Sequence, residues 1–80
     1  MTKREKIIEK LLNNPNSLKL SEIEILLFDL GFIFIEGKGS HRKITHKEKG
    51  IVYTYPVHGN DTLPIYKQRI SKMFKRYFNN

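Results

Sequence analysis

Residues 31–59, GFIFIEGKGSHRKITHKEKGIVYTYPVHG, decide the fold of this 80-residue chain. The segment holds three runs rich in β-branched and aromatic residues, with glycine-containing turns between them at 36–39 and 47–50. This composition predicts β-strands over 32–35, 40–46 and 51–57, joined as antiparallel hairpins. Pro56 has no N–H to donate to a strand ladder, so the third strand is expected to lie at a sheet edge or to end there.

Alternation along the second strand divides its side chains between two faces. Ile44 is the large apolar residue of this strand and is predicted to face the core, together with Arg42 and His46. The opposite, solvent-facing side then carries His41, Lys43 and Thr45. In the third strand the same rule predicts an inward set of Ile51, Tyr53, Tyr55 and Val57.

Apolar residues at helical spacing predict helices on both sides of this segment. Residues 3–13 form the first helix, which Pro15 stops. The second helix is expected to open at Ser21, in a capping box with Glu24, and to end at Gly31. The last helix begins near Pro64 and buries one stripe, composed of Tyr66, Ile70, Met73, Phe74 and Tyr77.

The expected order of elements is therefore α-α-β-β-β-α. Helices directly before and after a small antiparallel sheet pack on one of its faces and leave the other face to solvent. This α+β layout resembles that of double-stranded-RNA-binding domains, with an extra N-terminal helix. The length predicts a single domain, residues 1–80, with 1–20 as a helical extension and 21–80 as the double-stranded-RNA-binding-like part.

The composition excludes several kinds of site. The chain has no cysteine, which excludes a disulfide scaffold or a thiolate metal site and is consistent with a reducing cytoplasm. No apolar run approaches the roughly 20 residues that span a bilayer, so no membrane association is expected. The three histidines show no i, i+4 pair and no accompanying carboxylate ligand, so neither a metal nor another cofactor is expected.

The charge is strongly positive and unevenly distributed. Lys and Arg number 15 against 8 Asp and Glu, a net charge of +7. Residues 37–80 contain Glu48 and Asp61 as their only acidic residues, so a polyanion is expected to bind this half of the chain. The alternative is that the charge serves solubility alone.

Four short motifs stand out along the chain, namely Gly31-Phe32, Gly37-Lys38-Gly39-Ser40-His41, Tyr55-Pro56-Val57-His58-Gly59-Asn60 and Tyr66-Lys67-Gln68-Arg69-Ile70. In their order and spacing they resemble the HicA toxin family of bacterial type II toxin–antitoxin systems. The resemblance covers residues 21–78. Arg42 departs from the family pattern, in which another histidine or an apolar residue is more usual.

The resemblance implies a small ribonuclease that cleaves mRNA and a HicB-type antitoxin that masks the face carrying His41, its catalytic residue. The residues support this chemistry independently. Imidazole, with an ordinary pKa of about 6.5, can exchange protons near neutral pH, and metal-free RNA cleavage needs such a group beside positive charge. The predicted RNA-binding residues are Lys38, Ser40, Lys43, Arg69, Lys72 and Arg76.

Two other functions stay open at this point. One is a non-catalytic RNA-binding module of the same fold, and the other is a partner-binding adaptor. His58 is predicted to be structural, in the loop before the last helix, and His46 to pack at a strand end. Tyr53 and Tyr55 are expected in the core, although exposed tyrosines at these positions would stack on bases.

Overall fold

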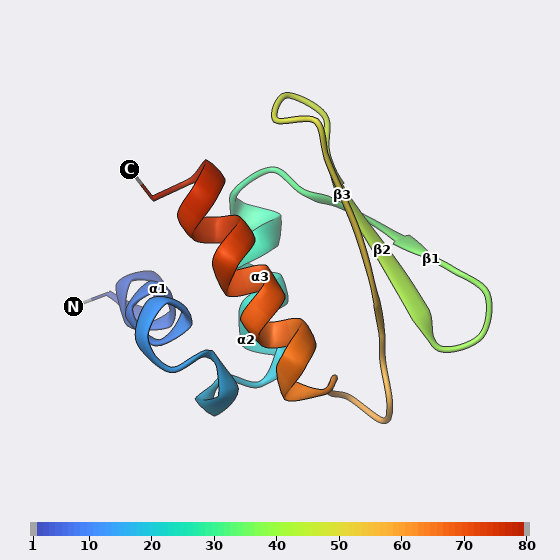
Figure 1. Cartoon of the computed structure of the whole chain (residues 1–80), viewed down its shortest axis with the longest axis horizontal. Coiled ribbons are helices and arrows are strands. Elements are labelled where there is room, and N and C mark those ends of the chain that lie inside the picture. The colour runs from blue at the N-terminus through green and yellow to red at the C-terminus, as the bar shows by residue number, and fades with distance from the viewer. Residues whose placement is uncertain (1, 80) are drawn as a thin grey trace.

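Over residues 2–79, which the computed structural model describes, three α-helices and three strands occur in the order expected from the sequence (Figure 1). A short 3-10 helix joins the first two α-helices. The elements are α1 (Lys3–Asn13), η1 (Pro15–Ser17), α2 (Leu20–Asp29), β1 (Ile33–Glu36), β2 (His41–His46), β3 (Ile51–Pro56) and α3 (Pro64–Tyr77).

The sheet is antiparallel, with the strand order β1-β2-β3. Its register places His41 opposite Pro56, and Ile44 opposite both Phe34 and Tyr53. β3 is an edge strand, as its proline predicted, and β1 forms the other edge.

The two faces of the sheet differ as alternation predicted. On the side of the helices, Ile44 and Tyr55 are fully buried and His46 is 7% exposed. On the other side His41 and Lys43 are exposed. We call this second side the open face.

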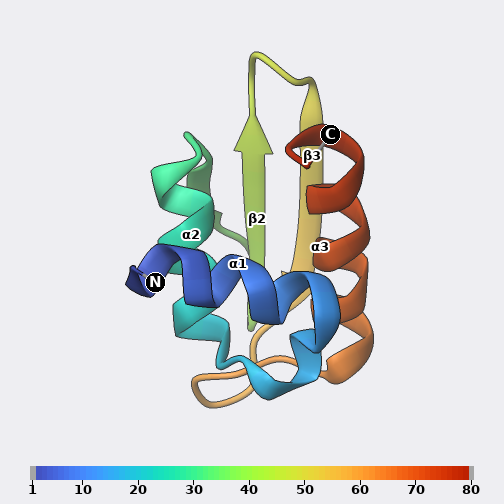
Figure 2. The same cartoon turned by 90° about the vertical axis from the view of Figure 1, so that its left-hand side faces the viewer.

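The helices lie in two layers on the same side of the sheet. α2 and α3 cover the sheet, and α1 crosses their outer side (Figure 2). The architecture is therefore the expected α+β fold, α-β-β-β-α with an additional N-terminal helix.

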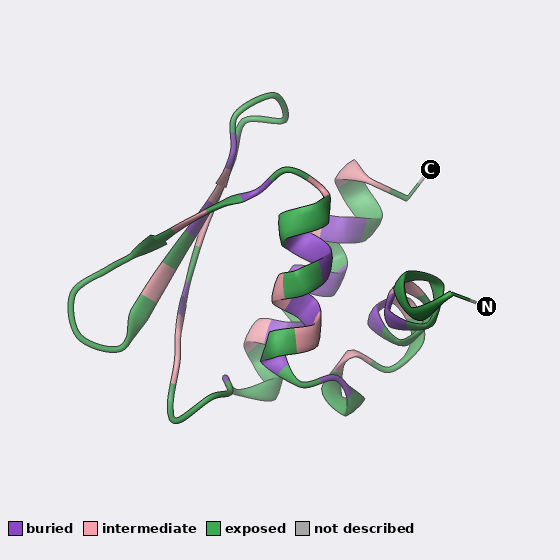
Figure 3. Cartoon of the chain, turned by 180° about the vertical axis from the view of Figure 1, so that it is seen from behind, coloured by how far each residue is buried: buried purple, intermediate pink, exposed green. Residues whose placement is uncertain are grey.

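The core is continuous across these layers, and buried positions recur along α1, α2, α3 and the sheet (Figure 3). Ile7 and Leu11 of α1 and Leu18 after η1 belong to the same cluster as the sheet residues. The single domain over residues 1–80, with residues 1–20 as an extension, stays a prediction. Residues 1 and 80 of that range lie outside the described part of the chain. No helix within residues 2–79 has the length and apolar character needed to cross a membrane.

The start of α2 differs from the expected one. The prediction that Ser21 caps the helix with Glu24 is wrong, because the helix already begins at Leu20. The backbone N–H of Lys19 donates to the Glu22 carboxylate at 3.0 Å, and that of Leu20 donates to Asp61 at 3.2 Å. These carboxylates take the capping role and leave Glu24 free to face the sheet.

The ends of the strands also shift by one residue. Phe32 is buried just before β1, whereas Ser40 and Val57 lie outside β2 and β3. Gly31 ends α2 with φ +100°, the left-handed conformation that the sequence predicted.

Candidate functional site

The turn before β2 holds His41 at the corner of the sheet. The backbone N–H of Gly37 donates to the carbonyl of His41 at 2.9 Å, and that of Val57 donates to the carbonyl of Ser40 at 2.6 Å. Gly39 has φ +65°, which an L side chain rarely adopts. The turn is therefore tied to both neighbouring strands, and it presents His41 at a defined place.

Four of the predicted site residues come together at this corner. His41 and Lys43 share the open face two residues apart, about 7 Å along the strand. Lys38 and Ser40 are exposed in the turn that leads into His41. The arrangement places one imidazole beside two ammonium groups and a hydroxyl, all accessible to solvent.

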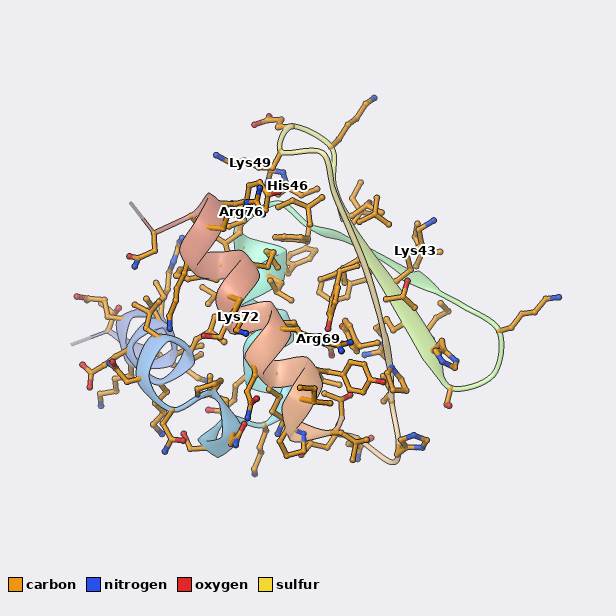
Figure 4. All side chains as sticks on the ribbon, viewed as in Figure 1. Lys43, His46, Lys49, Arg69, Lys72 and Arg76 are labelled. Carbon is orange, nitrogen blue, oxygen red and sulfur yellow. The ribbon has the colours of Figure 1, made fainter. Side chains whose placement is uncertain are left out.

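The other three predicted residues form a separate surface. Arg69, Lys72 and Arg76 are exposed along α3, on the helical side of the sheet, whereas Lys43 projects from the sheet itself (Figure 4). We call these three residues the basic ridge. The fold therefore does not place the basic ridge on the open face with His41.

His46 has the packing role predicted for it. Its ring contacts those of Phe32 and Phe78 at centroid distances of 5.0 and 5.3 Å. Nδ1 accepts the backbone N–H of Lys49 at 3.2 Å, so the proton of a neutral ring is on Nε2, which donates to the carbonyl of Leu30 at 2.9 Å. Both ring nitrogens are thus occupied by structural hydrogen bonds.

His58 lies in the loop that follows β3. Its backbone pairs with that of Asp61 through N–H to O distances of 2.8 and 3.1 Å, and its side chain is exposed. The Asp61 carboxylate is in turn bound by the Lys67 ammonium at 3.0 Å. Because Val57 is bonded to Ser40, the His58 backbone leaves the sheet beside the turn before His41.

Arg42, for which the sequence suggested only an inward direction, braces this corner. It donates to Glu24 of α2 at 2.6 Å and to Glu36 at the end of β1 at 3.1 Å. The hydroxyl of the buried Tyr55 also donates to Glu24, at 2.6 Å. An inward-facing arginine was itself a signal that a carboxylate lies nearby, because charged groups are seldom buried unpaired.

The contacts with Glu24 change the pKa values of Arg42 and Tyr55. The hydrogen bond from Arg42 to Glu24 raises the pKa of the guanidinium. Burial, followed by the contact with the Glu24 carboxylate, raises the pKa of the Tyr55 hydroxyl strongly. Both shifts favour the protonated forms, which are the forms that donate to Glu24 and join the sheet to α2 at this corner.

Residues 20–69, more than half of the chain, match the family described as "HicA toxin of bacterial toxin-antitoxin". The chain belongs to the HicA toxin family. No curated protein and no solved structure matches it.

Membership makes this HicA chain a toxin of the toxin–antitoxin type, a class of protein that has an antitoxin partner. The matched segment contains His41 and runs to Arg69, the first residue of the basic ridge. Lys72, Arg76 and the whole of α1 lie outside the match.

Two further features of this HicA chain concern the tyrosines of β3 and the side chains that could bind a metal ion. Tyr55 is fully buried in the core, and Tyr53 is half-buried, with a hydroxyl that has no hydrogen-bond partner among residues 2–79. Among those same residues, no three His, Cys, Asp or Glu side chains gather into a group that could hold a metal ion.

Proposed function

We propose that this HicA toxin is an endoribonuclease that cleaves mRNA without a metal ion or other cofactor, with His41 as its general acid–base residue. The observation that carries the proposal is the exposure of His41 on the open face, beside Lys43 and next to the turn with Lys38 and Ser40. Exposure lets a ribose reach the ring, and the positive charge around it suits a phosphodiester.

The reaction follows from the groups at this corner. The neutral imidazole of His41 removes the proton of a ribose 2′-hydroxyl, and the 2′-oxygen attacks the adjacent phosphorus. The bond from phosphorus to the 5′-oxygen breaks, and the proton passes from His41 to that oxygen. The products are a 2′,3′-cyclic phosphate and a 5′-hydroxyl end.

The lysines have an electrostatic role in this scheme. Negative charge develops on the phosphorane oxygens in the transition state, and Lys43 and Lys38 would stabilise it. Ser40 would donate a hydrogen bond to a phosphate oxygen. The basic ridge would hold the RNA backbone further from the reacting bond, in the manner of phosphate contacts that position a nucleic acid.

The natural setting of this reaction would be the cytoplasm, where mRNA is the substrate. A HicB-type antitoxin would inhibit the enzyme by covering the open face around His41. Covering this one corner blocks both the ring and the phosphate-binding lysines.

The decisive experiment compares RNA cleavage by the wild type and His41→Ala in the presence of EDTA. We expect the substitution to lower the rate by about 10²–10⁴, the usual contribution of a single acid–base group. Because His41 is exposed, the variant should unfold at the same urea concentration as the wild type. His58→Ala is the matched control and should keep most of its activity.

An unchanged rate in His41→Ala would exclude the catalytic role. Loss of cleavage in EDTA that added Mg²⁺ restores would show that a metal ion is needed.

A non-catalytic RNA-binding module is the second candidate. The observation that favours it is that, within residues 2–79, His41 is the only histidine on the open face, since His46 is buried and His58 lies in a loop. Wild-type protein that binds RNA with a steep salt dependence and leaves it intact would support this reading.

A further inference from the structure

The side of the molecule formed by α2 and β1 has a character opposite to that of the basic ridge. A groove of about 440 Å³ runs between these two elements. Its floor and walls include Ile25, Phe28 and Phe34. Phe28 is 70% exposed and Ile25 is 51% exposed, and together with Phe34 they form a contiguous apolar surface of the kind that marks an interaction site.

The rim of this groove is acidic. It carries three carboxylates, those of Glu24, Asp29 and Glu36, and a single basic residue, Arg42. Arg42 is already paired with Glu24 and Glu36. The groove is thus negative, although the whole chain has a net charge of +7.

One wall of the groove is a free strand edge. β1 pairs with β2 on one side only, and its residues Ile33 and Ile35 are 59% and 46% exposed on the open face. Figure 3 shows this side of the molecule, where exposed stretches of α2 and β1 face the viewer. A strand added to this edge would place alternate side chains against Ile33 and Ile35 and into the groove beside Phe34.

We propose that an extended segment of the antitoxin binds here, pairing with the free edge of β1 and inserting a bulky apolar side chain, flanked by Lys or Arg, between Phe28 and Phe34. The proposal rests on the antitoxin as partner and not on the ribonuclease activity. The groove would be a second contact surface for the antitoxin, in addition to the open face around His41. The two surfaces adjoin, because β1 borders both.

The charge of the groove argues against RNA as the occupant. The three carboxylates outnumber the single Arg42, so RNA phosphates are repelled here and are expected at the basic corner and ridge instead. The antitoxin is the partner that the toxin–antitoxin family implies. A stable complex buries about 1,200–2,000 Å² of surface. We therefore expect the contact to continue from the groove across β1 onto the neighbouring open face.

The test uses a purified HicB-type antitoxin that binds the wild-type toxin, titrated into the toxin by calorimetry. Phe28→Ala should weaken the affinity at least tenfold, as expected for an aromatic residue at the centre of an interface. Leu63→Ala is the matched control, since Leu63 is also an exposed apolar residue, at 54%, but lies before α3. It should leave the affinity within twofold of wild type.

A second pair of variants tests the charge. Asp29→Lys should weaken antitoxin binding about tenfold at low salt and less at high salt, because replacing this carboxylate with an ammonium group removes the net negative charge of the rim. Glu48→Lys makes the same change of charge in the turn between β2 and β3 and should have little effect. Amide exchange at residues 33–36 should slow in the complex if the antitoxin pairs with β1.

The proposal is overturned if Phe28→Ala and Asp29→Lys both bind the antitoxin as tightly as wild type. It is also overturned if Phe28→Ala weakens RNA binding instead, or if it dissociates a dimer of the free toxin, since the occupant is then RNA or a second copy. RNA cleavage is measured on the same samples. If the wild type does not cleave RNA but Phe28→Ala still weakens antitoxin binding, the proposed docking surface is supported and only the proposed ribonuclease function is excluded.

Discussion

At the scale of single residues, the backbone around His41 depends on the small size of Gly37. A Cβ atom at Gly37 would lie 3.2 Å from the His41 carbonyl oxygen and 3.5 Å from the His41 Cβ. Gly37 does not have a positive φ, unlike Gly39, so close approach and not backbone conformation requires glycine here. The sequence predicted both glycines as permissive turn residues. The structure shows that glycine is required for a different reason at each of the two positions.

Gly37→Ala should therefore displace His41 by a few tenths of an ångström. We expect RNA cleavage to fall about tenfold, because small misplacements of a reacting group are costly. The free energy of unfolding should fall by about 1 kcal/mol. Both are measured on the same sample, by single-turnover cleavage and urea unfolding.

Gly50→Ala is the control, in the hairpin at the other end of β2. Gly50 has φ +65°, so alanine is strained there and costs a similar amount of stability. Its cleavage rate should stay at the wild-type level. Equal loss of activity in both variants would mean that stability, and not the position of His41, limits the rate.

At the scale of elements, Asp61 and Lys67 join the loop after β3 to α2 and α3. The Lys67 ammonium, on a residue only 5% exposed, donates to the Leu18 carbonyl at 2.7 Å and contacts Asp61 at 3.0 Å. Asp61 also accepts the N–H of Leu20. These contacts hold the loop that contains His58 against the start of α2 and the first turns of α3.

These contacts lower the pKa of Asp61. Burial alone would raise the pKa of this carboxyl, but the hydrogen bonds from Lys67, Thr62 and Leu20 outweigh it. A carboxyl with a lowered pKa in the folded state stabilises that state above its unfolded pKa of about 3.9. This stabilisation is lost as the pH falls from about 4 through the folded pKa.

Asp61→Asn should consequently cost about 1–3 kcal/mol of unfolding free energy at pH 7, because the ammonium of Lys67 loses its counter-charge. The difference from wild type should shrink as the pH is lowered from about 4 toward 2. Urea unfolding at a series of pH values measures it. Glu48→Gln, at an exposed turn position, should change the stability by less than about 0.5 kcal/mol. A cost independent of pH would argue against the ionic contact.

At the scale of the whole molecule, α1 is part of the core although the family match begins after it. Leu11 is fully buried, and its carbonyl accepts the hydroxyl of Ser71 in α3. The Leu18 carbonyl in the same segment accepts from Lys67. Polar groups of α3 thus depend on acceptors that the first twenty residues supply.

Leu11→Ala should lower the free energy of unfolding by about 2–5 kcal/mol, the cost of a cavity in a core. We propose that the chain is one domain, so circular dichroism and tyrosine fluorescence should report a single, coincident transition. Lys10→Ala, one position away and exposed, should have little effect. Separate transitions, or a cost below about 1 kcal/mol, would show α1 to be an appendage.

The secondary structure and the faces of the strands were predictable because they depend on local pattern. The alternation around Ile44 placed His41 and Lys43 on the solvent side, and the structure agrees. The exposed apolar groove between α2 and β1 was not predicted, because its walls come from two elements that only the tertiary structure brings together. The capping prediction at Ser21 was wrong because acceptors from Glu22 and from the distant Asp61 compete with a local serine.

The sequence by itself determined the order of elements, the positive charge and the exposure of His41, since each follows from residues a few positions apart. Only the tertiary structure decided which charges are free. Arg42 and Lys67 are bound to partners 18 and 49 residues away, whereas Lys43 and the basic ridge face solvent. The physical reason is that the pairing of charges depends on which elements pack together. Local periodicity carries no information about contacts between residues that are far apart in the sequence.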